Sequence, residues 1–183
     1  MKYFFLSALL VIGLVACKQS VKGENGVTYK SPTQYNDYIV TRQTTLMKNV
    51  LGFGEIADKS LDSAATMLKS GVIQVDKMIN ELKGMPPYKG DSSLRDAAVK
   101  SFRFYKGVFE KEYVDILNIR KKGEENITSE DVAEANRIVD KIGKEEEGLD
   151  KAFHNAQKNF AERNNMKLID NSMQKEVDKL NKE

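Results

Sequence analysis

Apolar residues recur at intervals of three and four over most of the chain, which is the spacing of one face of an α-helix. Four such helical segments are expected, over residues 31–58, 60–84, 92–122 and 128–163. No segment alternates between apolar and polar residues for long enough to predict a β-strand. The pattern therefore predicts an all-α fold.

The expected helices begin at residues that can cap them. Ser31 precedes Pro32, a residue favoured in the first turn, and Ser60 can cap the second segment. Thr128 with Asp131 forms a variant of the capping box at the start of the fourth. These signals are local, so they predict where each helix starts without reference to packing.

Short turns separate the four segments. Pro86 and Pro87 cannot continue the second helix, and a glycine-containing turn follows the third at Gly123. Short connections make antiparallel neighbours the simplest arrangement, so residues 31–168 are expected to form an up-down-up-down four-helix bundle. Residues 169–183 form a C-terminal tail with the spacing of a short amphipathic helix.

The fourth segment has the most regular pattern, with apolar gaps of three and four over about eight turns. Its predicted buried stripe is Val132, Ala135, Val139, Ile142, Glu146, Leu149, Phe153, Ala156 and Phe160. Only Glu146 breaks the apolar character, and a buried carboxylate needs a hydrogen-bond donor. Arg42, Asn49 or Tyr105 could supply one. Glu146 either fixes the helix register or gives a core-bound ligand its polar contact.

The N-terminus resembles an export signal. Lys2 precedes a run of 14 uncharged residues, Tyr3 to Ala16, which is shorter than the ~20 residues that a membrane-spanning helix needs. Residues 1–16 are therefore expected to be a signal peptide. Cys17, which follows directly, is the single cysteine of the chain, so an intramolecular disulfide is not expected.

The order Leu14, Val15, Ala16, Cys17 resembles the lipobox of bacterial lipoproteins. That resemblance implies cleavage between Ala16 and Cys17 and a thioether-linked diacylglycerol on Cys17. Two or three acyl chains such as palmitate anchor a protein durably, whereas one holds only marginally. The alternative is a structural cysteine that happens to follow an ordinary signal peptide.

Residues 17–30 are polar and contain two glycines, so they are expected to be a flexible tether. Lys18 follows the cysteine. In many bacteria with two membranes an Asp at this position retains a lipoprotein at the inner membrane, so Lys18 favours the outer membrane if the host has one.

Composition and motifs argue against several functions. The 29 basic and 27 acidic side chains balance, so no basic face for nucleic acid is expected. A di-iron bundle site needs two Glu-x-x-His units, but the single His154 has Lys151 three residues before it. Haem between Met47 and His154 is not expected either, because the heptad turns His154 toward solvent. No nucleophile motif is present, so neither an enzyme nor a cofactor is predicted.

Four short sequence segments resemble a family of helical bacterial surface lipoproteins whose function is unassigned. They are "YNDYIV", "PYKGDSSLRDA", "FYKGVFEKEY" and "EEEGLDKAFHNAQKNFAERNNMKL", and the likeness spans Tyr35 to Leu168. The resemblance implies lipidation and an all-α fold. It brings no catalytic or ligand-binding residues.

The expected function is that of a lipid-anchored envelope protein, a non-enzymatic structural or interaction module that binds an envelope or external protein. The alternative is a carrier that binds a small ligand in the bundle core, with Glu146 as its polar contact.

Overall fold

The computed structural model describes residues 9–13 and 20–170. Ala16, Cys17 and the tail from residue 171 onward therefore lie outside the described residues. Among the helices in those ranges, none is long and apolar enough to cross a bilayer.

The described chain is predominantly helical, which confirms the expected fold class at that level. The helices are α1 (Pro32–Lys59), α2 (Leu61–Lys83), α3 (Ser93–Gly107), η1 (Val108–Glu112), α4 (Tyr113–Arg120), η2 (Glu124–Asn126) and α5 (Ser129–Arg163). Here η1 is a π-helical segment that joins α3 to α4 without a break, and η2 is a 3-10 turn. Helix boundaries thus agree with the sequence prediction within one or two residues.

The predicted caps are present. Ser31 accepts a hydrogen bond from the backbone N–H of Gln34, and Ser60 accepts one from Ser63. At the start of α5, Thr128 and Asp131 exchange both bonds of the capping box, at 3.1 and 3.2 Å. Local sequence was sufficient for these starts because each cap uses residues within three positions of one another.

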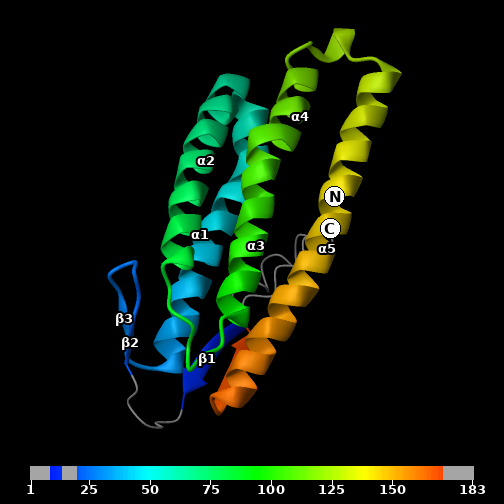
Figure 1. Cartoon of the computed structure of the whole chain (residues 1–183). Coiled ribbons are helices and arrows are strands. Elements are labelled where there is room, and N and C mark those ends of the chain that lie inside the picture. The colour runs from blue at the N-terminus through cyan, green and yellow to red at the C-terminus, as the bar shows by residue number, and fades with distance from the viewer. Residues whose placement is uncertain (1–8, 14–19, 171–183) are drawn as a thin grey trace.

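Neighbouring helices along the chain lie side by side (Figure 1). α1 packs against α2, α2 against α3, and α5 returns alongside α3. Buried aromatic rings connect them: Phe53 of α1 stacks on Tyr113 of α4 at 4.3 Å between centroids, and Tyr35 stacks on Phe160 of α5 at 5.4 Å. The core is therefore continuous from the hairpin end of the molecule toward its far end.

The prediction that the chain has no strand is wrong. Within the described residues the strands are β1 (Leu9–Gly13), β2 (Val21–Lys22), β3 (Thr28–Tyr29) and β4 (Met166–Asp170). β1 pairs antiparallel with β4, from Leu9 opposite Asp170 to Gly13 opposite Met166. Each strand has five residues or fewer, too short for an alternating pattern to be visible in the sequence.

Two predicted segments are corrected by these strands. The expected flexible tether is, from Val21 to Tyr29, a β2–β3 hairpin whose turn contains Gly26 at φ +79°. Burial of the Tyr29 ring holds this hairpin on the helices. The expected tail helix does not begin at residue 169, because Ile169 and Asp170 belong to β4.

The buried stripe of α5 also differs from the prediction at its N-terminal end, where Val132 and Val139 are 51% and 40% exposed. The buried residues of α5 are Ile138, Ile142, Gly143, Glu146, Asp150, Phe153, Gln157, Phe160 and Ala161. They form a broader stripe because α5 packs on α3 with one side and turns another side toward β4 and, through the Gln157–Asn36 hydrogen bond, toward α1.

Gly71 of α2 faces the ring of Phe109 in η1. A Cβ atom at position 71 would lie 3.1 and 3.2 Å from two atoms of that ring, which is closer than ordinary contact. Replacing Gly71 with Val should therefore lower the free energy of unfolding by about 1–3 kcal/mol, as overpacked cores do. Urea denaturation followed by circular dichroism measures this change.

Gly54→Ala is the matched control, because Gly54 is an exposed residue of α1 with nothing near its missing Cβ. This substitution should raise stability by up to ~1 kcal/mol through helix propensity. A Gly71→Val protein as stable as the unaltered chain would contradict the close approach of α2 and η1.

Candidate functional site

Two carboxyl groups lie buried one turn apart on α5. Glu146 is 1% exposed and Asp150 is 6% exposed; together they are called the carboxyl pair. The Tyr105 hydroxyl of α3 donates a hydrogen bond to Glu146 Oε1. Glu146 Oε2 and Asp150 Oδ2 are buried and find no hydrogen-bond partner in the part of the chain that the structure describes. Buried polar atoms without partners are rare, so this pair is the first candidate for a functional site.

Burial changes the ionisation of both groups. It raises the pKa of Glu146 from 4.5 to about 7, against a smaller lowering by the Tyr105 hydrogen bond. It raises the pKa of Asp150 from 3.8 to about 9, and the nearby charge of Glu146 adds to the rise. Burial, with the neighbouring carboxylates, holds the pKa of Tyr105 well above 10. Near pH 7, Asp150 is therefore protonated and Tyr105 remains a donor.

α1 contributes a third polar side chain to the same region. Gln157 of α5 donates a hydrogen bond of 2.8 Å to Asn36 of α1, and the two helices run in opposite directions (Figure 1). Seven residues, or about 10.5 Å of helix, lead from Asn36 to Gln43 and from Gln157 back to Asp150. Gln43 and Asp150 therefore lie at about the same level along the two helices.

Gln43 is 1% exposed, and neither its amide nitrogen nor its amide oxygen has a hydrogen-bond partner among the described residues. We call the region between these two helices the α1–α5 seam. It contains Asn36, Gln43, Glu146, Asp150 and Gln157.

The structure brings only one of the three proposed donors to Glu146. Tyr105 lies against it, whereas Arg42 and Asn49 do not. Arg42 pairs with Glu81 of α2, and Asn49 donates to Gln74 of α2 at 2.6 Å. Both side chains occupy the flank of α1 that faces α2, because residues 42 and 49 are two turns apart on one side of the helix. The lipidation site Cys17 lies outside the described residues.

The heptad pattern predicted that His154 turns toward solvent, but the structure does not turn it fully outward. It is half-buried, and its Nδ1 is buried without a hydrogen-bond partner in the described chain. Residue 154 lies one helical turn after Asp150, on the side of α5 that lines the seam, and this position explains its partial burial. Sequence reasoning also missed Asp150 and Gln43. Asp150 could have been found from its i+4 spacing to Glu146, but Gln43 had no local signal.

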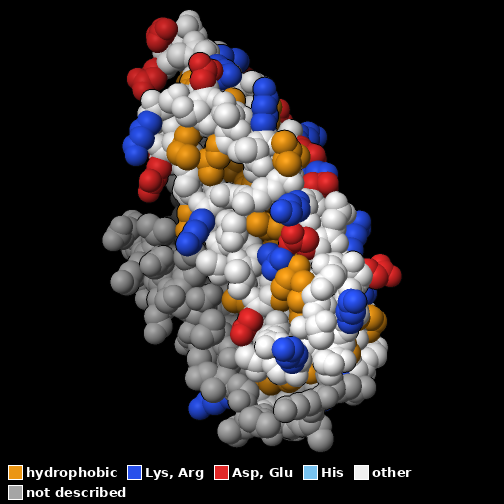
Figure 2. Space-filling model, turned by 90° about the vertical axis from the view of Figure 1, so that its left-hand side faces the viewer, with side chains coloured by type: hydrophobic (Ala, Val, Ile, Leu, Met, Phe, Trp, Pro, Cys, Tyr) orange, Lys and Arg blue, Asp and Glu red, His pale blue; other side chains and the backbone are white. Residues whose placement is uncertain are grey.

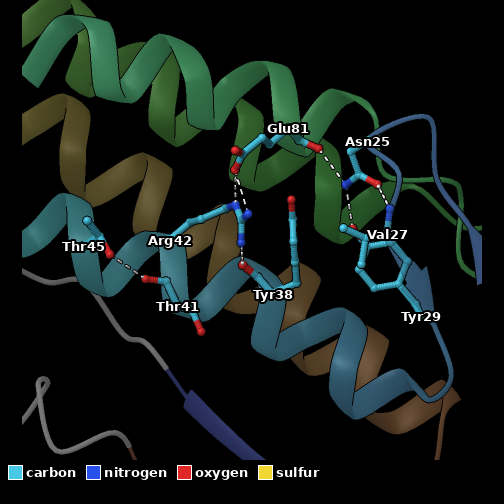
Figure 3. Close-up of polar contacts among 8 residues, drawn as sticks. All are labelled: Asn25, Val27, Tyr29, Tyr38, Thr41, Arg42, Thr45 and Glu81. Carbon is cyan, nitrogen blue, oxygen red and sulfur yellow. Dashed lines mark hydrogen bonds and ion pairs between the residues drawn. The ribbon is translucent and has the colours of Figure 1, made fainter.

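A second polar cluster connects the β2–β3 hairpin to the helices (Figure 3). The guanidinium of Arg42 donates to Glu81 Oε2 from Nε at 2.8 Å and pairs with it through Nη2 at 2.6 Å. Its Nη1 donates to the backbone oxygen of Tyr38, and its Cζ lies 3.3 Å from the centre of that ring. This arrangement joins α1 to α2 by charge and by a cation–π contact.

Asn25 attaches the hairpin to the same place. Its side-chain nitrogen donates to the Tyr29 hydroxyl at 2.7 Å and to the backbone oxygen of Glu81 at 3.0 Å (Figure 3). Its side-chain oxygen accepts from the backbone N–H of Val27 at 3.1 Å. We call Asn25, Tyr29, Tyr38, Arg42 and Glu81 the hairpin clamp.

The surface offers shallower features. A groove of about 710 Å³ lies between the hairpin and α2, beside Asn25 and the exposed Ile73. A smaller one of about 200 Å³ lies between α3, η1 and α5, beside Arg103 and Lys141. Neither is lined by the carboxyl pair. On the face in Figure 2, acidic and basic side chains are interspersed, so that face has no concentrated basic area.

Within residues 9–13 and 20–170, no group of three or more His, Cys, Asp and Glu side chains is arranged to hold a metal ion. Comparison of the chain with protein-family models, with curated proteins and with solved structures gave no match. The resemblance to surface lipoproteins therefore stays a prediction, and the site has to be interpreted from its own chemistry.

The carboxyl pair predicts an unusual pH dependence of stability in the full-length chain. Between about pH 5 and 9 the native state holds protons that the unfolded chain has released, so stability should fall as pH rises. One pKa unit corresponds to ~1.4 kcal/mol, so Glu146 alone should cost on the order of 3 kcal/mol between pH 5 and 7. Urea denaturation at several pH values measures the slope.

The Glu146→Gln/Asp150→Asn double variant should lose this slope, whereas Glu147→Gln, on the exposed side of α5, should keep it. Tyr105 on α3 and Tyr113 on α4 also face the pair, but both remain protonated throughout this range because burial raises the pKa of each phenol. Equal slopes for the unaltered chain and the double variant would show that the pair is solvated.

The hairpin clamp predicts that Asn25→Ala loosens the hairpin. Two side-chain donors and one acceptor are lost, so the free energy of unfolding should fall by about 1–2 kcal/mol. Amide hydrogen exchange over residues 21–29 should accelerate. Glu24→Ala, an exposed neighbour, serves as the control. Unchanged exchange in Asn25→Ala would mean that the Tyr29 ring and the backbone bond from Asn25 N–H to Gly84 hold the hairpin without the side chain.

Proposed function

We propose that the chain is a lipid-anchored bacterial cell-envelope protein that acts as a non-enzymatic structural or protein-interaction module. One observation carries the proposal. A single cysteine directly follows an uncharged run of 14 residues, in the order Leu14, Val15, Ala16, Cys17. Removal of residues 1–16 and acylation of Cys17 would give the body its attachment.

The β2–β3 hairpin begins close to Cys17 in the sequence, and this limits how far the body can lie from the proposed anchor. Three residues separate Cys17 from Val21, the first residue of β2. Even fully extended, that connection reaches only about 14 Å. A lipid on Cys17 would therefore hold the hairpin end of the body close to the bilayer, and the hairpin clamp would pass this constraint to α1 and α2.

The same orientation directs the opposite end of the molecule away from the membrane. We propose that α1, α2, the continuous α3–η1–α4 rod and α5 form an up-down-up-down four-helix bundle. α5 has 35 residues, which corresponds to about 52 Å. The connection between α4 and α5, at the upper end in Figure 1, would face outward. Val132 and Val139, exposed near that end, would be available to an envelope or external protein partner.

Localisation follows from the anchor. Export and lipidation would place the protein in the cell envelope, and Lys18 beside the acylated cysteine favours the outer membrane in a host that has two membranes. The balanced charge count gives no reason to propose nucleic acid as a partner.

The unpartnered polar atoms of the α1–α5 seam favour a second candidate function, a carrier for a small ligand. Glu146 would then be one polar contact within a larger set that includes Asp150 and Gln43. Such atoms cost free energy unless another group satisfies them, which a bound polar ligand would do.

Replacing Cys17 with Ser tests the anchor. The unaltered chain, produced in an exporting bacterium, should lose residues 1–16, gain the mass of its acyl chains and partition into detergent. Cys17→Ser should keep the precursor mass and leave the detergent phase. Intact-mass spectrometry and phase partitioning measure both properties.

Ser7→Ala, inside the apolar run, is the control that leaves Leu14 to Cys17 unchanged. The proposal fails if Cys17→Ser and the unaltered chain have the same processing and the same partitioning.

A further inference from the structure

We propose that the α1–α5 seam is a binding site for a primary ammonium group carried on an apolar stem. The inference rests on the proposed function, because the seam becomes accessible only after the leader, which includes β1, has been removed. The ligand would lie between Gln43 of α1 and the carboxyl pair of α5.

Three of the unsatisfied atoms in the seam are acceptors, and their type selects this chemistry. Gln43 Oε1, Glu146 Oε2 and Asp150 Oδ2 are buried oxygens without hydrogen-bond partners in the described chain. A primary ammonium has three N–H donors and no acceptor, so it matches three acceptor oxygens. It also supplies the positive charge that two buried carboxyl groups lack, which an alcohol or an amide would not do.

Two different helices, α1 and α5, line the seam. It therefore differs from an acidic cluster on the surface of a single helix. Gln43 is fully buried with neither amide atom partnered among the described residues, and the Asn36–Gln157 hydrogen bond places it at about the level of Asp150. Metal ions fit the donor set less well. Calcium takes six to eight oxygen ligands, and the seam offers two carboxyl groups and one amide.

The leader strand shows how a ligand would be accommodated. β1 packs against α1 and pairs with β4, and β4 packs against α5, so the β1–β4 pair lies between the two helices. After the turn at Asn164 and Asn165, β4 runs back along α5 for about 13 Å, which brings Asp170 near the level of Asp150. Leu9 pairs with Asp170, so the Leu9 end of β1 lies near the carboxyl pair.

Removal of residues 1–16 would therefore vacate a slot one strand wide that leads to the carboxyl pair. Val40 and Met47 lie three residues before and four residues after Gln43, on the same flank of α1, and both are buried. This flank gives the slot an apolar wall. An aliphatic stem along that wall, with its ammonium group at Gln43 Oε1, Glu146 Oε2 and Asp150 Oδ2, would match both the apolar wall and the three acceptor oxygens.

Isothermal titration of the mature lipidated protein in detergent at pH 7 tests the inference, with n-butylamine and 1-butanol as matched probes. The amine should bind at least tenfold more tightly than the alcohol. Binding should release at least one proton, because Asp150 and the protonated fraction of Glu146 have to ionise, and titration in buffers of different ionisation enthalpy measures that release. A third probe, Nα-acetyl-lysine amide, distinguishes a lysine side chain of a protein from a free amine as the source of the ammonium group. Tighter binding of either one than of the alcohol supports the ammonium site.

The variants Glu146→Gln and Asp150→Asn keep the size of each side chain and should each weaken amine binding at least tenfold. Glu147→Gln should leave binding unchanged. Equal affinity for amine and alcohol, or unaltered amine binding in both seam variants, overturns the inference. The intact mass, measured before each titration, separates the two proposals. A retained leader contradicts the proposed function, whereas a processed protein that fails to bind amine contradicts only the seam site.

Discussion

Two buried carboxyl groups on the flank of a long helix, with no cation paired to them in the part of the chain that the structure describes, set the main constraint on this structure. Ionised carboxylates are costly to bury, so Glu146 and Asp150 must be protonated, hydrogen-bonded or matched by a positive charge. Tyr105 satisfies one oxygen of the four. The rest of α5 packs through Phe153 and Phe160, so the helix cannot rotate the pair into solvent without exposing those rings. The aromatic core and the polar seam are thus linked by one rigid element.

The two ends of the molecule differ in what holds them. At the hairpin end, side chains from the hairpin, α1 and α2 meet through Asn25, Arg42 and Glu81, and the rings of Tyr29, Tyr35 and Phe160 pack in sequence. At the far end, α5 leaves Val132 and Val139 uncovered. A body packed firmly near its proposed anchor and open at its far end is suited to presenting a surface away from a membrane, which is the role proposed for it.

Local features of the fold could be predicted from the sequence, whereas features that depend on register could not. The caps at Ser31, Ser60 and Thr128 use residues a few positions apart, so the helix starts were predictable. The β2–β3 hairpin has two residues in each strand and depends on Asn25 reaching Glu81, more than fifty residues later. For the same reason, Tyr105 could be named as a partner of Glu146 only as one of three alternatives. Gln43 lies in the seam because of how α1 lies alongside α5. No spacing of residues within α1 indicates that arrangement.

Titration of the carboxyl carbons of Glu146 and Asp150 by ¹³C NMR in the full-length chain tests the central claim most directly. The account predicts apparent pKa values of about 7 and 9, with each resonance responding to the ionisation of the other group. Titration of both carboxyl groups near pH 4, as in unfolded chains, would contradict it, because the pair would then be in contact with water and would impose no constraint on the helices around it.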